Sequence, residues 1–374
     1  MKTFFLYAVI SLLIINVYGQ TKPLRNAQTQ LLIKNLKKSA EKGDIIFGVA
    51  NSLSKSYKSP DGKNFLTGDC EAITGQNSGF VENDFLFYDN KEFKRFEIEK
   101  IKRYSKESNI VFGYCWHLKG MNGETFRNTS EDKNLAADIV DNPESAQCKW
   151  FNAQIDSIIP VFKQLDFPVT FRPFHEMNGG WFWWGKENIT PQQYIKLYRL
   201  LVDRIRNAGV DNVVYVWSPD TYCDTTYYPG DDYVDIAGLD VYEPACSPYH
   251  ADTVYACETK KMLEFTHNHK IMAAICETGL REYNNVYCYP VDHPDFWTSK
   301  VFSQLLDNKL KGKGWVYVLS WYNCDYNLDD KGFFYIPFKG FENRFGSQGQ
   351  KAVDDFIKLK NYKHVLFADE ISKM

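Results

Sequence analysis

Short apolar runs alternate with longer amphipathic stretches along most of the chain. Runs that are nearly continuous in apolar residues are typical of parallel strands buried on both faces. They predict eight strands, at Ile45–Ala50, Phe85–Phe87, Ile110–Trp116, Val169–Phe174, Val213–Trp217, Val234–Leu239, Ile271–Cys276 and Trp315–Ser320.

The stretches between these strands have the patterns of helices. Examples of the predicted helices are Lys91–Glu107, Cys148–Leu165, Pro191–Ala208, Ala251–His267 and Pro294–Leu310. Thr190 is the expected N-cap of the helix that begins at Pro191, since proline is favoured at the first helical position. Eight strands separated by helices predict an α/β fold, the (β/α)8 TIM barrel, with its active site at the C-terminal ends of the strands.

A doubly wound open sheet is the competing arrangement. Such a sheet usually carries a G-x-G-x-x-G loop after its first strand. The segment FGVANSLSK, which begins at Phe47, does not match that pattern. No linker, internal repeat or low-complexity tract divides the chain after its N-terminus. Residues 20–374 are therefore predicted to form a single (β/α)8 catalytic domain.

The first 19 residues have the pattern of a signal peptide. Lys2 gives a positive start, an apolar segment runs from Phe4 to Val17, and Val17-Tyr18-Gly19 resembles a cleavage site. The sequence therefore predicts a secreted, extracellular protein. No later segment has the roughly 18 apolar residues that a membrane span requires, so no membrane partner is expected.

Charge and composition narrow the function further. The formal net charge is −3, which argues against a nucleic-acid partner because such proteins usually carry a basic excess. Aromatic residues make up 16% of the chain; Trp and Tyr faces suit the CH faces of sugars, but the same content also fits a large core. Nine cysteines in an extracellular protein predict several disulfides, with at least one cysteine left over and the pairing open.

Residues at the ends of the predicted strands carry the candidate chemistry, because these ends face the mouth of a barrel. Glu176 follows the fourth strand and Glu277 follows the seventh, on opposite sides of the barrel axis. Glycoside hydrolysis needs two carboxyl groups, one protonated and one ionised, and a separation of roughly 5–5.5 Å gives retention of configuration. The other polar and aromatic residues expected at this face include Trp116, His117, Arg172, His175, Tyr242 and Trp321.

Other catalytic classes fit the sequence less well. His175-Glu176 begins like the zinc motif H-E-x-x-H, but the fifth residue is Gly179, which excludes a metalloprotease helix. No G-x-S-x-G elbow is present, which argues against an esterase. No C-x-x-C pair is present, so a structural zinc site is not expected. The segment Trp181–Trp184 fits either a sugar-binding platform or a buried loop anchor.

Four segments resemble glycoside hydrolase family 26: FRPFHEMNGGWFWWG (171–185), YYPGDDYVDIAGLDVY (227–242), ETG (277–279) and VLSWYN (318–323). The resemblance spans about residues 40–345, and the family consists mostly of β-mannanases on a (β/α)8 barrel. It implies a retaining endo-β-1,4-mannanase that hydrolyses mannan, glucomannan or galactomannan. The implied partners are β-mannan polysaccharides and manno-oligosaccharides. No metal or organic cofactor is implied, and a monomer is the default.

The resemblance also implies roles for individual residues. Glu176 matches the acid/base and Glu277 the nucleophile of the family. Arg172 is expected beneath them as a charge partner that keeps a carboxylate ionised. The residues implied to bind sugar or to orient the site are Trp116, His117, His175, Trp181, Trp184, Tyr242 and Trp321.

One departure from the family concerns the glycone end of the site. Many members carry arginine after the tryptophan of the eighth strand, where this chain has Tyr322. Two alternatives to a mannanase stay open at this point. The same fold could act on mixed-linkage β-glucan, or the chain could be an inactive carbohydrate-binding protein.

Overall fold

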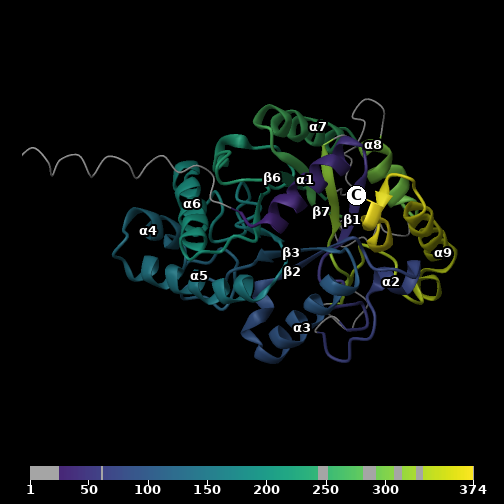
Figure 1. Cartoon of the computed structure of the whole chain (residues 1–374), viewed down its shortest axis with the longest axis horizontal. Coiled ribbons are helices and arrows are strands. Elements are labelled where there is room, and N and C mark those ends of the chain that lie inside the picture. Colours follow the sequence, from purple (N-terminus) through teal and green to yellow (C-terminus); the bar gives the residue numbers. More distant parts are fainter. Residues whose placement is uncertain are drawn as a thin grey trace, which may run out of the picture.

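The computed structural model describes residues 25–59, 62–242, 252–280, 292–306, 314–325 and 332–373. Its centre is a barrel of eight parallel strands in chain order, closed by pairing of the last strand with the first (Figure 1). This closed barrel confirms the predicted (β/α)8 fold. The strands are β1 (Ile45–Val49), β2 (Phe80–Asp84), β3 (Val111–Trp116), β4 (Val169–Pro173), β5 (Val213–Trp217), β6 (Ile236–Asp240), β7 (Met272–Thr278) and β8 (Trp315–Ser320).

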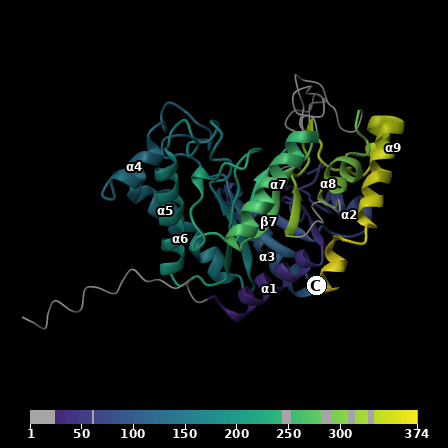
Figure 2. The same ribbon diagram turned by 90° about the horizontal axis from the view of Figure 1, so that it is seen from above.

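Helices surround the barrel, with α4, α5 and α6 on one side and α9 on the other (Figure 2). The α-helices are α1 (Ala27–Glu41), α2 (Asp69–Thr74), α3 (Lys91–Glu107), α4 (Leu135–Asp141), α5 (Ala146–Gln164), α6 (Pro191–Asn207), α7 (Asp252–His269), α8 (Ser303–Leu305) and α9 (Phe341–Lys360). Short 3-10 helices are η1 (Phe85–Asp89), η2 (Thr225–Tyr227) and η4 (Ala368–Lys373), and η3 (Phe296–Phe302) is a π-helix.

The start of α6 has the cap that the sequence predicts. The Thr190 hydroxyl accepts a hydrogen bond from the backbone N–H of Gln193, and the Gln193 side chain accepts one from the backbone N–H of Thr190. This reciprocal pair is a capping box, which satisfies two backbone donors that the helix leaves free. The predicted helix Pro294–Leu310 is different, since η3 and the short α8 occupy its described part.

The second predicted strand, Phe85–Phe87, is wrong. These residues belong to η1, and β2 lies immediately before them at Phe80–Asp84. The sequence of β2 is FVEND, and all five residues are buried. Glu82 and Asp84 are buried because Arg172 from β4 and His117 from the end of β3 form hydrogen bonds with their carboxyl groups. An apolar run was therefore the wrong signal for a strand whose carboxylates face the interior.

The barrel interior is closed at its N-terminal end by segments from both ends of the described chain. Leu36 and Ala40 of α1 pack with inward-facing residues such as Ile46 and Val216. A short strand near the C-terminus, β11 (Val365–Leu366), pairs in parallel with the first residues of β1. A further two-stranded sheet, β9 (Cys324–Asp325) and β10 (Gly332–Phe333), is antiparallel. The opposite end of the barrel remains available for a site.

The predicted signal peptide and disulfides concern residues that lie partly outside the described ranges. The predicted signal peptide, residues 1–19, lies outside them, as do Cys246 and Cys288. Among the described cysteines, the six at Cys70, Cys115, Cys148, Cys223, Cys257 and Cys276 are free, so none of these six forms an expected disulfide.

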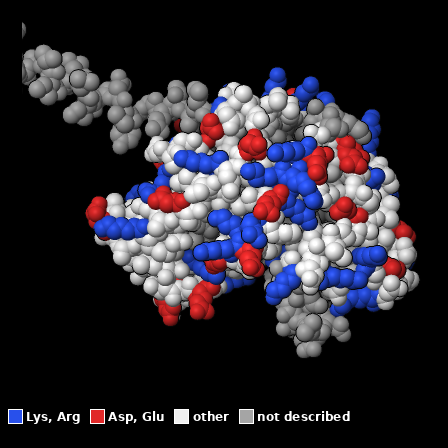
Figure 3. Space-filling view, turned by 60° about the horizontal axis from the view of Figure 1, so that its bottom comes forward, with Lys and Arg blue, Asp and Glu red and all other residues white. Residues whose placement is uncertain are grey.

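Within the described ranges, no helix is long and apolar enough to span a bilayer. On the face shown in Figure 3, Lys and Arg side chains lie interspersed with Asp and Glu side chains.

Candidate active site

A cleft of about 470 Å³ lies at the C-terminal ends of the strands. Both predicted carboxyl groups line it, Glu176 from the loop after β4 and Glu277 from the end of β7. Other predicted site residues that line the same cleft are His117, His175, Trp181, Tyr242 and Trp321. The strand ends thus bring together side chains that are separated by up to about 200 residues in the chain.

Glu277 is held by two donors, one from β4 across the barrel and one from the segment after β6. Arg172 Nη2 lies 2.6 Å from Glu277 Oε1, and the Tyr242 hydroxyl donates a hydrogen bond of 2.7 Å to Oε2. The side chain of Glu277 is almost completely buried. Each carboxyl oxygen therefore has its own donor, which fixes the orientation of the group without involving Glu176.

Arg172 is completely buried and lies among three carboxyl groups. Besides Glu277, its guanidinium contacts Glu82 Oε2 at 2.6 Å and Asp240 Oδ2 at 2.8 Å. Burial raises the pKa of Glu82 and raises that of Asp240 well above its ordinary value, and the charge of Arg172 offsets only part of this effect. One cation cannot balance three anions in a buried site, so this cluster holds at least one proton on Glu82 or Asp240.

Glu176 sits on a strained turn after β4. Its φ is +56° and that of Phe174 is +52°, a left-handed conformation that residues other than glycine adopt at a free-energy cost. The Tyr194 hydroxyl donates to the Phe174 carbonyl at 2.9 Å, and Trp184 Nε1 donates to the His175 carbonyl at 2.8 Å. These hydrogen bonds from buried side chains stabilise the turn that presents Glu176 to the cleft.

The carboxyl group of Glu176 has surroundings quite different from those of Glu277. Trp181 Nε1 donates a hydrogen bond of 2.6 Å to Glu176 Oε2. Trp181 also lines the cleft and is only partly buried. Glu277 contacts a buried cation whereas Glu176 contacts a neutral indole, and such unequal environments separate an acid from a nucleophile in glycosidases.

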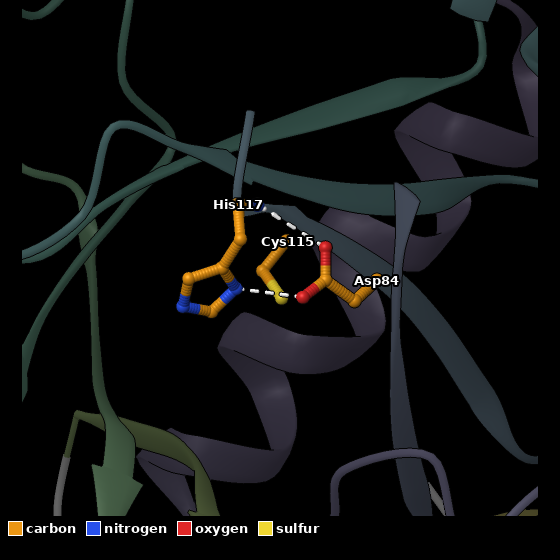
Figure 4. Close-up of side chains that lie close together, drawn as sticks. All are labelled: Asp84, Cys115 and His117. Atoms are coloured by element: carbon orange, nitrogen blue, oxygen red, sulfur yellow. Dashed lines mark hydrogen bonds and ion pairs between the residues drawn. The ribbon is translucent and has the colours of Figure 1, made fainter. Parts of the chain in front are cut away.

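A chain of hydrogen bonds runs from β2 to the loop after β4. His117 Nδ1 lies 2.6 Å from Asp84 Oδ2 (Figure 4), and His117 Nε2 lies 3.1 Å from His175 Nε2. Burial disfavours an ionised Asp84, but its interactions with His117 and its backbone hydrogen bonds outweigh this effect and lower the pKa of Asp84. Burial and the nearby Arg172 lower the pKa of His175 well below its ordinary value, so that this ring is neutral.

Two groups of side chains in the described ranges have the spacing of metal ligands: Asp84, Cys115 and His117 (Figure 4), and His175, Asp240 and Glu277. In the first group, Asp84 and His117 already bind each other, and burial raises the pKa of the Cys115 thiol well above its ordinary value. A neutral thiol is a poor metal ligand. In the second group, Asp240 and Glu277 are engaged by Arg172. Neither donor set fits a metal ion well.

The structure does not bring two of the predicted sugar-binding residues into the cleft. Trp184 is completely buried and stacks on Phe182, with ring centroids 4.5 Å apart. Trp116 faces away from the barrel interior and packs edge-on against Phe85, 6.2 Å between centroids. Trp116 points away from the cleft because successive residues of a strand point to opposite faces, whereas Trp184 is buried in the loop after β4.

Other residues of the site were missed at the sequence level. Asp84, Phe126 and Arg127 line the cleft, and Glu82 and Asp240 contact Arg172 below it. A signal existed for Asp240, since it directly follows the sixth predicted strand, Val234–Leu239. Tyr322, which replaces the arginine of many family members, also lines the cleft.

Residues 22–308 match the sequence profile of Glycosyl hydrolase family 26. The chain belongs to this family. A mannan endo-1,4-beta-mannosidase of Bifidobacterium adolescentis is 29% identical over 238 residues, covering 58% of this chain and 23% of that protein. The enzyme of the same name from Thermothelomyces thermophilus is 30% identical over 228 residues, covering 53% of this chain and 45% of that protein. The chain thus spans less than half the length of either relative.

The fold of the family member from Bacillus sp. JAMB-750 is similar. That structure is the catalytic domain of an endo-beta-1,4-mannanase, and it superimposes with a TM-score of 0.79 at 22% identity, covering 94% of this chain and 95% of the other. Members of the family therefore share the barrel described here at low sequence identity.

Proposed function

We propose that this family 26 protein is a secreted, retaining endo-β-1,4-mannanase. The observation that carries the proposal is the pair Glu176 and Glu277 in one cleft, at the ends of β4 and β7, each with its own set of donors. Two carboxyl groups with different surroundings on facing strand ends suit an acid/base and a nucleophile.

In the first step, a carboxylate oxygen of Glu277 attacks the anomeric carbon of the bound sugar. The bond from this carbon to the glycosidic oxygen breaks, and Glu176 donates its proton to the departing oxygen. Arg172 and Tyr242 hold Glu277 so that the attacking oxygen is aimed rather than free to rotate. Trp181 holds the Glu176 carboxyl through its indole N–H.

In the second step, Glu176 removes a proton from a water molecule whose oxygen attacks the same carbon. The ester bond to Glu277 breaks, and both glutamates return to their starting states. Two inversions at one carbon give net retention of configuration. Trp321 and His117, which lie with ring centroids 5.9 Å apart on the cleft wall, are suited to bind the sugar that undergoes attack.

The names of the two curated relatives support mannan as the substrate, since both are called mannan endo-1,4-beta-mannosidase. The expected partners are β-mannan polysaccharides and manno-oligosaccharides, acted on by a monomer. Secretion is supported by the signal-peptide pattern of residues 1–19.

The test is release of reducing sugar from linear mannan, glucomannan, galactomannan, mixed-linkage β-glucan and xylan, measured side by side. Release from the mannans alone supports the proposal, whereas release only from β-glucan changes the substrate. Binding without hydrolysis of any polymer leaves a carbohydrate-binding protein. Proton NMR of the first products must show the β-anomer, and an α-anomer contradicts retention.

A further inference from the structure

A second cavity of about 430 Å³ lies next to the active-site cleft. Its volume is in the range of small-molecule pockets, roughly 300–1,000 Å³. It lies outside the barrel wall, between the segment η1–α3 and the helix α5, and we call it the side pocket. Leu86 and His117 line both the side pocket and the active-site cleft. The two spaces are therefore neighbours that share one wall.

Aromatic side chains that are fixed in place line the interior of the side pocket. Trp116 is only 4% exposed, and Tyr88 is held by a hydrogen bond of 2.9 Å between its hydroxyl and that of Tyr114. Trp150 lies with its ring centroid 6.2 Å from that of the buried Trp183. Rigid aromatic surfaces of this kind suit the CH faces of a sugar ring, because little conformational entropy is lost when a ligand binds.

Polar groups of both signs complete the side pocket. Lys119 Nζ and Asp89 Oδ2 form an ion pair of 2.7 Å, and Lys94 Nζ lies 5.6 Å from the centroid of the Tyr88 ring. The side-chain amide of Gln154, which can both donate and accept, has no hydrogen-bond partner within the described part of the chain. Paired charges and an amide beside aromatic rings match the hydroxyl groups of a neutral sugar better than an anion.

We propose that the side pocket binds a neutral hexopyranosyl branch of the polysaccharide whose backbone occupies the cleft. The inference rests on the proposed function, since it assumes a sugar polymer in the cleft. The two shared residues carry the argument: Leu86 and His117 line both spaces, so a backbone sugar bound against His117 places a single-sugar branch next to the side pocket, whose lining includes Gln154 and Trp150. The side pocket would make this chain selective for branched mannan.

The first experiment compares two variants of the side pocket on two substrates. Gln154→Ala removes the unpartnered amide, and Ser157→Trp fills the pocket from an exposed position on α5. We expect the ratio of kcat/KM for galactomannan to kcat/KM for linear mannan to fall about fivefold in each, as for loss of one neutral hydrogen bond or more. Lys149→Ala, on the same helix but outside the pocket, must leave the ratio unchanged. Thermal unfolding of each variant checks that it is folded.

An unchanged ratio in both pocket variants overturns the inference, even if both rates fall, because the pocket then acts only through its shared wall.

A second experiment needs no turnover: affinity electrophoresis of the full chain and its variants in gels that contain galactomannan or linear mannan. If the variants migrate faster than the wild type only in galactomannan gels, the side pocket binds a branch. If they lose retardation equally in both gels, the side pocket binds a separate chain, which contradicts the proposal. If the wild type hydrolyses neither polymer but shows this selective retardation, the proposed function fails and the side pocket stands.

Discussion

Asp84 Oδ2 lies 2.6 Å from His117 Nδ1, and Asp84 Oδ1 accepts the backbone N–H groups of Leu86 and His117. One buried carboxylate therefore accepts three hydrogen bonds, and the ring nitrogen that faces it must carry a proton. This contact leaves His117 Nε2 facing His175 Nε2 at 3.1 Å, where only one of the two atoms can supply the shared proton. The position of a proton in the cleft is thus set from β2.

The first prediction concerns Asp84→Asn. The asparagine oxygen would keep the two backbone donors, so that its NH2 group faces His117 Nδ1 and forces that nitrogen to accept. The proton then moves to Nε2, where it meets the N–H of His175. We expect kcat/KM on mannan to fall about ten- to a hundredfold, as for loss of a charged hydrogen bond.

Nitrogen-15 NMR of the histidine rings checks the tautomer of His117 directly, which a merely structural effect would not change. Glu92→Gln, at an exposed position on α3, serves as the control. Unchanged ring signals and wild-type rates in Asp84→Asn would show that Asp84 does not set the tautomer.

The second prediction separates the roles of the two glutamates by the leaving group. Glu277→Ala should lose several orders of magnitude in kcat on every substrate, because the nucleophile is needed whatever group departs. Glu176→Ala should lose as much on mannan but far less on an aryl mannobioside, because an aryl oxide of low pKa departs without a proton. Glu187→Ala, an exposed carboxylate in the same loop, is the control. Equal losses of the two variants on both substrates would sink the assignment.

The third prediction concerns the buried cation. Arg172→Met should lower the free energy of unfolding by about 3–5 kcal/mol, because Glu82, Asp240 and Glu277 would remain buried without a positively charged partner. Arg204→Met removes a partly exposed ion pair with Asp156 and should change the free energy of unfolding by less than about 1 kcal/mol. Urea unfolding at neutral pH measures both. A similar small effect of the two substitutions would mean that the cluster is neutralised by protons and not by Arg172.

The sequence predicts the site wherever a functional residue follows an apolar strand. Glu176 and Glu277 could be found in this way, because β4 and β7 are apolar runs that end in a short polar motif. Asp84 could not be found in this way, because its strand also carries the polar residues Glu82 and Asn83. The nearest apolar run is Phe85–Phe87, so the strand was predicted there. The partners that permit this polar strand, Arg172 and His117, lie 90 and 33 residues away in the chain.

The sequence also could not show the direction in which each side chain points. Trp116 and His117 are adjacent, yet the first packs outward toward Phe85 and the second points into the cleft. Similarly, Trp181 reaches Glu176 whereas Trp184, three residues later, is buried under the turn. A motif indicates which residues are near a site, but the direction of each side chain depends on the packing around it.

The fourth prediction concerns pH and stability away from the cleft. Glu97 of α3 is completely buried, and burial raises its pKa from the usual 4.5 to about 7, although Ser54, Tyr88 and Lys55 oppose the change. The folded protein therefore keeps a proton that the unfolded chain loses at lower pH. Stability from this group is fully present below about pH 4.5 and is lost as the pH rises through about 7.

Glu97→Gln removes this dependence, since an amide does not titrate. Relative to the wild type, the variant should gain up to roughly 3 kcal/mol in free energy of unfolding between pH 4.5 and pH 8, at about 1.36 kcal/mol per pKa unit. Urea unfolding of both proteins across this range measures the difference, and Glu99→Gln at an exposed position of the same helix is the control. If the difference between Glu97→Gln and the wild type stayed constant with pH, Glu97 would have to be ionised in the folded state, with Lys55 as its counter-charge.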